Sequence, residues 1–148
     1  MQYFNTEDIN DFSMLYRLNM INSITGYKSA NMIGTRSNSG KENVAIFSSI
    51  THLGSNPALL HFTLRPNTVP RDTYKNIKEN KVFTVNHVSL NQIEEAHHTS
   101  AKYDEAISEF DQTLLEAEYK IDWYAPFVKG SPVALGCRYL NEYYIEEN

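Results

Sequence analysis

Four short strand-like runs lie between residues 24 and 88, and they limit the possible folds more than any other feature. They are Ile24–Arg36, Asn43–Leu53, Ala58–Leu64 and Lys81–Val88. Apolar residues in these runs recur in alternation or in short blocks, as they do in buried or half-buried strands. The turn sequence Asn38–Lys41 separates the first two runs, so we expect those strands to form an antiparallel hairpin.

Helix-like segments flank and interrupt the strands. Asn5 or Thr6 is a suitable N-cap for a short first helix, whose apolar face is Ile9, Phe12, Leu15 and Tyr16. Further along the chain, the sequence predicts a helix over Thr73–Lys78 and a capping-box pair of Ser89 with Gln92. It also predicts a helical piece around Tyr103–Phe110 and a last strand over Val133–Ile145. Regular strand–helix–strand units are missing, which predicts an α+β fold, mainly β, with a small antiparallel barrel.

Length and composition restrict the function classes. A chain of 148 residues is one domain by length, spanning 1–148. The net charge of −5 and the lack of a basic run argue against nucleic acid as a partner. No apolar stretch reaches the length of a membrane span, and the polar N-terminus does not resemble a signal peptide. The single cysteine, Cys137, fits a reducing compartment, so we expect a cytoplasmic protein.

The segment Arg65–Thr73 lies between a strand-like run and a helix-like run. Backbone N–H groups and the positive end of the helix dipole favour an anion at such a junction. Arg65 and Arg71 add planar forks that match phosphate oxygens. These residues therefore predict a phosphate site, although surface ion pairs with Asp72 or Glu79 would also account for both arginines.

Two further polar groups follow apolar strand residues. Lys28-Ser29-Ala30-Asn31 offers an ammonium, a hydroxyl and an amide, and Phe47-Ser48-Ser49 offers two hydroxyls. Because an amide hydrogen-bonds both donor and acceptor edges of a heterocycle, these groups could hold a flat polar ring beside the phosphate. Ser48 and Ser49 are also ordinary strand residues, and no Gly-x-Ser-x-Gly motif makes either one a nucleophile.

Two other features favour structural roles. Glu94 and His98 share a helical face but lack the His-Glu-x-x-His spacing, so no metal site is predicted there. Cys137 has apolar neighbours and is expected to be a small buried residue.

The order and spacing of several motifs resemble the flavin reductase-like family, which has the FMN-binding split β-barrel fold, of Greek-key type with inserted helices. The resemblance covers most of the chain and is densest from Asn19 to His87. The matching segments are Leu18–Thr35, Asn43–Ser49, Gly54–Pro57, Arg65–Ile77 and Phe83–His87. Family members usually continue past the last strand, whereas this chain stops at Asn148, as a short version or without a C-terminal part.

The resemblance implies positions for the cofactor-binding residues. On the phosphate side they are Arg65, Thr68, Val69, Arg71, Asp72 and Thr73. Around the ring and the ribityl chain they are Lys28, Ser29, Ala30, Asn31, Ala45, Phe47, Ser48, Ser49, Asn86 and His87. No catalytic residue is assigned, because the flavin carries the redox chemistry.

The implied function is that of an FMN-binding flavoprotein, a NAD(P)H-dependent flavin reductase that transfers hydride to flavin. It is expected to be a homodimer that uses NADH or NADPH or a redox partner protein. One alternative is a flavoredoxin-like electron carrier, or a flavin-binding module without nicotinamide turnover. A third reading is a barrel that binds no flavin and serves in dimerisation.

Overall fold

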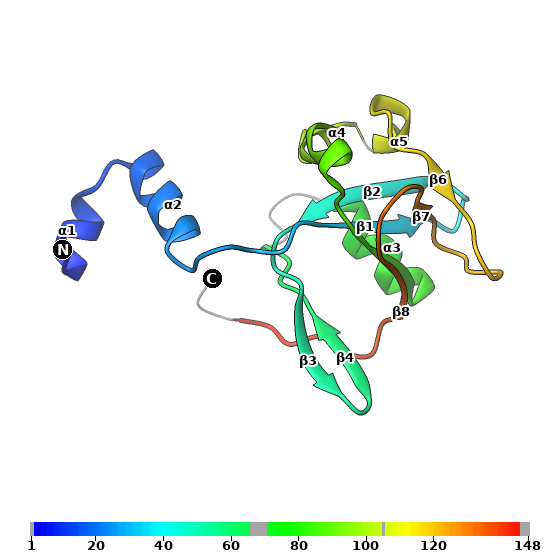
Figure 1. Ribbon diagram of the computed structural model, residues 1–148, viewed down its shortest axis with the longest axis horizontal. Coiled ribbons are helices and arrows are strands. Elements are labelled where there is room, and N and C mark those ends of the chain that lie inside the picture. The colour runs from blue at the N-terminus through cyan, green and yellow to red at the C-terminus, as the bar shows by residue number, and fades with distance from the viewer. Residues whose placement is uncertain (1, 66–70, 105, 146–148) are drawn as a thin grey trace.

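The computed structural model describes residues 2–65, 71–104 and 106–145, which form helices and antiparallel strands (Figure 1). The helices are α1 (Thr6–Asp11), α2 (Met14–Ser23), α3 (Asp72–Asn80), α4 (Ile93–His98) and α5 (Glu109–Gln112), with a 3₁₀ turn at Leu90–Gln92. The strands are β1 (Asn31–Arg36), β2 (Glu42–Phe47), β3 (Thr51–Ser55), β4 (Ala58–His61), β5 (Val82–His87), β6 (Ala117–Glu118), β7 (Phe127–Val128) and β8 (Ala134–Arg138). The predicted α+β fold, mainly β, is confirmed.

The main sheet has the strand order β2-β1-β5-β8, and every neighbouring pair is antiparallel. β1 is central, because Ile33 lies opposite Ala45 of β2 and opposite Val85 of β5. β3 and β4 form a separate hairpin that projects away from this sheet (Figure 1). β6 and β7 form a short pair of their own, which the sequence pattern did not predict.

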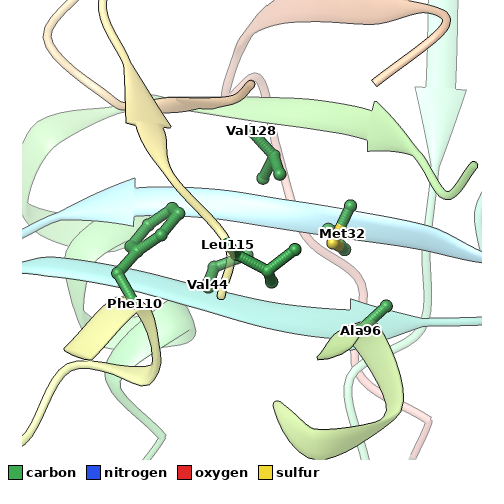
Figure 2. Close-up of a cluster of buried hydrophobic side chains, with 6 residues drawn as sticks. All are labelled: Met32, Val44, Ala96, Phe110, Leu115 and Val128. Atoms are coloured by element: carbon green, nitrogen blue, oxygen red, sulfur yellow. The ribbon is translucent and has the colours of Figure 1, made fainter. Parts of the chain in front are cut away.

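Two hydrophobic clusters cover the two faces of the main sheet. The first contains Met32, Val44, Ala96, Phe110, Leu115 and Val128, and Figure 2 shows these side chains gathered around β1 and β2. The second contains Ile33, Ile50, Ile77, Phe83 and Val85. Neighbouring side chains of a strand point to opposite faces, so β1 contributes to both clusters and is buried from Asn31 to Thr35.

Local signals placed several element boundaries correctly. The Asn5 side chain accepts a hydrogen bond from the Asp8 N–H and forms a capping box that starts α1. Ser89 and Gln92 form the predicted capping box. The turn around Gly40 joins β1 to β2, as the hairpin prediction required.

The structure corrects other boundaries. The predicted first helix is two helices, because the backbone is extended at Phe12 and Ser13 caps a new start. The run Ile24–Arg36 is a strand only from Asn31, after Gly26 with its φ of +81°. The run Asn43–Leu53 divides into β2 and β3. The helical piece predicted around Tyr103–Phe110 is the shorter helix α5, which begins at Glu109. The strand predicted over Val133–Ile145 is the shorter strand β8, which ends at Arg138.

The N-terminal arm, residues 2–24 with α1 and α2, stands apart from the sheets in Figure 1. Neither helix has a buried residue. The helices pack on each other through Phe4, Phe12 and Tyr16, whose rings meet edge to face. Residues 25–30 are all exposed and form the linker to β1.

Candidate functional site

The strand-to-helix junction keeps its predicted place in the fold. The chain leaves β4 at His61, Arg65 is exposed, and α3 begins at Asp72 with Arg71 as its N-cap. Among the described residues, the Arg71 side chain makes no capping hydrogen bond to the first turn of α3, and the leading N–H groups of a helix favour an anion. Two predicted residues, Thr68 and Val69, lie outside the described residues.

Asp72 and Thr73 make contacts within the protein at this junction. The Asp72 carboxylate lies 3.5 Å from the Lys41 ammonium, which offsets its negative charge beside the helix start. The Thr73 hydroxyl is buried and accepts a hydrogen bond from the Asn43 amide at 3.1 Å. Thr73 therefore presents its backbone N–H, rather than its hydroxyl, to a ligand at the helix terminus.

A buried polar network fixes the start of α3 against the sheet. The Asn43 amide also donates to the Thr35 hydroxyl at 3.2 Å, and the Asn76 amide donates to the same hydroxyl at 3.1 Å. Ile77 of α3 packs into the second cluster together with Ile33. These contacts set the position of the helix terminus without using an exposed side chain.

A shallow hollow of about 160 Å³ lies near the other end of β1. Its lining residues are Ser29, Asn31, Ile50, Thr51, His52, Leu60, Val85, His87 and Leu135. Ligand pockets for molecules of drug size commonly measure about 300–1,000 Å³, so the hollow in one chain is smaller than such a pocket.

Hydrogen bonds order the polar wall of the hollow. Asn31, only 2% exposed, donates from its amide to the Ser29 hydroxyl at 3.0 Å. Ser29 in turn donates to the Ile50 carbonyl at 3.3 Å. The sheet register places Asn31 opposite Phe47 and His87, and residues directly opposite each other share one face. Three strands thus bring predicted residues to the same side.

Asn86 points to the opposite face. It pairs with Met32 rather than Asn31, and its side chain is 0% exposed. Its amide donates to the Met32 carbonyl and the Thr84 hydroxyl, and its oxygen accepts from the Val128 N–H. The structure therefore brings His87, but not Asn86, to the hollow.

The remaining predicted residues differ in exposure. Lys28 and Ala30 lie in the exposed linker, and Ser48 is exposed after β2. Ala45 is half-buried on the strand face shared with Phe47. The Ser49 hydroxyl exchanges hydrogen bonds with the Thr63 backbone at 3.0 and 3.1 Å, so it closes the base of the β3–β4 hairpin.

Sequence reasoning missed the hairpin side of the hollow. Thr51, His52 and Leu60 reach it because β3 pairs with β4, and the register puts His52 opposite Leu60. The turn residues Gly54–Pro57 between two apolar runs were the available signal for this pairing. Leu135 comes from β8, which pairs with Val85 of β5.

Two titratable side chains near the cores have shifted pKa values. Burial raises the pKa of the Cys137 thiol to about 11, so little reactive thiolate is present at neutral pH. Burial also raises the pKa of Glu109, whose carboxylate accepts a hydrogen bond from the Val44 N–H at 3.2 Å. Neither side chain lines the hollow.

Residues 26–147 match the model of the flavin reductase like domain. The chain belongs to the flavin reductase-like family. A similar solved structure is a protein with a split-barrel domain from Shewanella frigidimarina NCIMB 400, which is assigned as a flavin reductase. The two sequences are 41% identical and the TM-score is 0.95. The match covers 99% of this chain and 73% of that chain. The predicted family and the split-barrel fold are confirmed.

Two more distant structures share the fold. The flavoredoxin of Desulfovibrio vulgaris (Miyazaki F) is 21% identical with a TM-score of 0.71, covering 80% of this chain and 64% of that one. The FMN-binding domain of a flavin reductases-like enzyme from Shewanella baltica OS155 is 22% identical with a TM-score of 0.69, covering 78% and 59%. A curated but uncharacterized Aquifex aeolicus protein is 29% identical over 72% of this chain, and the chain spans 55% of its length.

The described residues form neither a metal-binding cluster nor a membrane-spanning helix. Within residues 2–65, 71–104 and 106–145, no three His, Cys, Asp or Glu side chains gather as metal ligands would. None of the helices described there has both the length and the apolar character that a membrane span requires.

Proposed function

We propose that this protein binds FMN and acts as a NAD(P)H-dependent flavin reductase. The observation that carries the proposal is a pair of features in one flavin reductase-like chain. One is the N-terminus of α3, which begins at Asp72 with Arg71 as its N-cap, and the other is a hollow with a polar wall around Asn31. The hollow and α3 lie on the same sheet face, because both adjoin the cluster of Ile33 and Val85.

Each feature suits one part of FMN. A phosphomonoester carries about −1.5 to −2 charges near neutral pH, which two arginines and the α3 N-terminus would complement. Ser29, Asn31 and His87 would hydrogen-bond the polar edge of the ring, with Leu60 and Leu135 as apolar neighbours. When bound, FMN supplies the hydride-accepting and electron-transferring chemistry.

The protein's own contribution is binding and orientation. The network of Asn43, Thr35 and Asn76 holds the helix terminus in place, and the Ser29–Asn31 bond fixes the polar wall. Preorganised donors of this kind cost little rearrangement when a charged ligand binds. The proposal includes a homodimer, and a cytoplasmic location that the single cysteine favours.

Spectroscopy and kinetics test this function directly. The purified protein is titrated with FMN and with riboflavin while the thermal midpoint is followed, and NADH and NADPH oxidation is measured with added FMN. We expect FMN to raise the midpoint and nicotinamide oxidation to depend on FMN. Flavin binding without turnover would support the electron-carrier alternative instead. A midpoint unmoved by either flavin would refute both flavin functions.

A further inference from the structure

The N-terminal arm presents an apolar row that no described part of its own chain covers. Met14, Leu15, Leu18 and Ile21 of α2 recur at helical spacing and are 76%, 70%, 45% and 45% exposed. The opposite side of α2 faces α1, where Tyr16 meets Phe12 and Arg17 donates to the Asn10 carbonyl. α1 therefore covers one side of α2 and leaves the apolar row free.

The arm makes no described hydrogen bond to the barrel of its own chain. Within the described part of the chain, hydrogen bonds from residues 2–27 all end within the arm and linker. The first bond that ties this region to the barrel is from Ser29 to Ile50. Nothing described holds the apolar row against its own sheets.

The accessible surface of the chain is larger than that of a compact monomer of the same mass. It measures 10678 Å², whereas a compact monomer of 17.0 kDa exposes about 7,700 Å². The excess of about 3,000 Å² is well above the ~800 Å² that each partner gives to a standard interface. The exposed area is therefore large enough for an interface with a second copy.

An apolar surface also exists on the barrel. The β3–β4 hairpin and the start of β8 expose Leu60 and Leu135, which line the hollow, and also Leu53 and Val133. The hairpin, residues 51–61, contains two histidines and no acidic residue, while the arm carries three acidic residues and one arginine. Both surfaces are thus apolar, and the hairpin presents no acidic side chain that would repel the acidic arm.

We propose that the arm of one copy docks through the Met14, Leu15, Leu18 and Ile21 row onto the β3–β4 hairpin face of a second copy. The exposed linker lets the arm reach across, and the docked arm covers the rim of the partner's hollow. This inference rests on the proposed homodimer and adds the surface that forms it. A hollow of about 160 Å³ is then completed by the partner.

The test compares two single variants of the full chain, Leu18→Asp and Asn19→Asp. Asn19 is one residue further along α2 and therefore about 100° around the helix from Leu18. Sedimentation equilibrium without flavin should show that the wild-type chain is a dimer. Leu18→Asp should raise the dimer dissociation constant at least about 30-fold, which is the effect of substituting a hot-spot residue. Asn19→Asp should leave the dissociation constant close to the wild-type value. Circular dichroism and FMN titration are recorded separately for each variant.

Cross-linking identifies the docked surface. Leu18→Cys in a Cys137→Ser background is labelled with a photoreactive maleimide and mixed with unlabelled ¹⁵N-enriched chain. We expect adducts between ¹⁴N arm peptides and ¹⁵N peptides of the β3–β4 hairpin. Adducts confined to one chain, or adducts on another face, would overturn the proposal. So would a wild-type monomer, or a Leu18→Asp variant as dimeric as Asn19→Asp, whether or not FMN binds.

Discussion

Asn86 has both polar atoms of its side chain engaged inside the protein. Its amide bonds Met32 and Thr84, and its oxygen accepts the Val128 N–H. We expect Asn86→Ala to lower the free energy of unfolding by about 2–4 kcal/mol, because buried partners lose their bonds. His87→Ala, at an exposed neighbour, should change it by less than about 0.5 kcal/mol. Urea denaturation measures both, and equal losses would contradict the assignment.

Arg65 is exposed after β4, and it precedes α3 in the sequence. If it contacts the flavin phosphate, Arg65→Ala should weaken FMN binding by about tenfold or more, because a charge-assisted bond contributes about 1.5–3 kcal/mol. Riboflavin, which lacks the phosphate, should bind almost unchanged. Fluorescence titration of both ligands measures the difference, with the exposed Lys102→Ala as the control. An equal loss for both flavins would exclude the phosphate contact.

At the scale of elements, the sequence predicted the helix starts and turns that are set by residues close together in the sequence. The N-cap at Asn5, the capping box at Ser89 and the turn before β2 are local interactions, and all three are present. Strand ends were less predictable, because they depend on pairing. β2 ends at Phe47, before Ser48 and Ser49, although the predicted run continued to Leu53.

The candidate site was predicted in part for the same reason. Ser29, Asn31 and His87 line the hollow and were named from the family resemblance. Thr51 and Leu60 reach the hollow through the β3–β4 register, which no short motif specifies. Asn86 and His87 are adjacent in sequence, but only pairing with β1 decides which of them faces the hollow.

Glu109 links α5 to β2 and gives a pH-dependent prediction. Burial raises the pKa of this carboxyl, so the fold prefers the protonated form and loses stability as pH rises above the ordinary value of 4.5 through the raised value. Glu109→Gln keeps an acceptor for the Val44 N–H without the charge. The variant should therefore gain stability relative to wild type at neutral pH, and the gain should vanish in acid. Thermal melts across pH measure this, and a gain that grows towards acid would contradict it.

At the scale of the whole molecule, the proposed dimer would make thermal stability depend on protein concentration. Unfolding of a dimer is coupled to dissociation, so its midpoint rises with protein concentration. For two chains of 148 residues, a rise from about 5 to 100 µM should raise Tm by about 3 °C. Differential scanning calorimetry measures the shift, with Leu18→Asp as the variant expected to lose it. A concentration-independent wild-type midpoint would contradict a dimer that dissociates on unfolding.

The exposed linker between α2 and β1 also has an evolutionary consequence. The family model matches from residue 26, inside this linker, so the arm precedes the matched part of the chain. No described arm residue belongs to either core cluster. Substitutions in the arm can therefore accumulate without repacking the cores of the barrel.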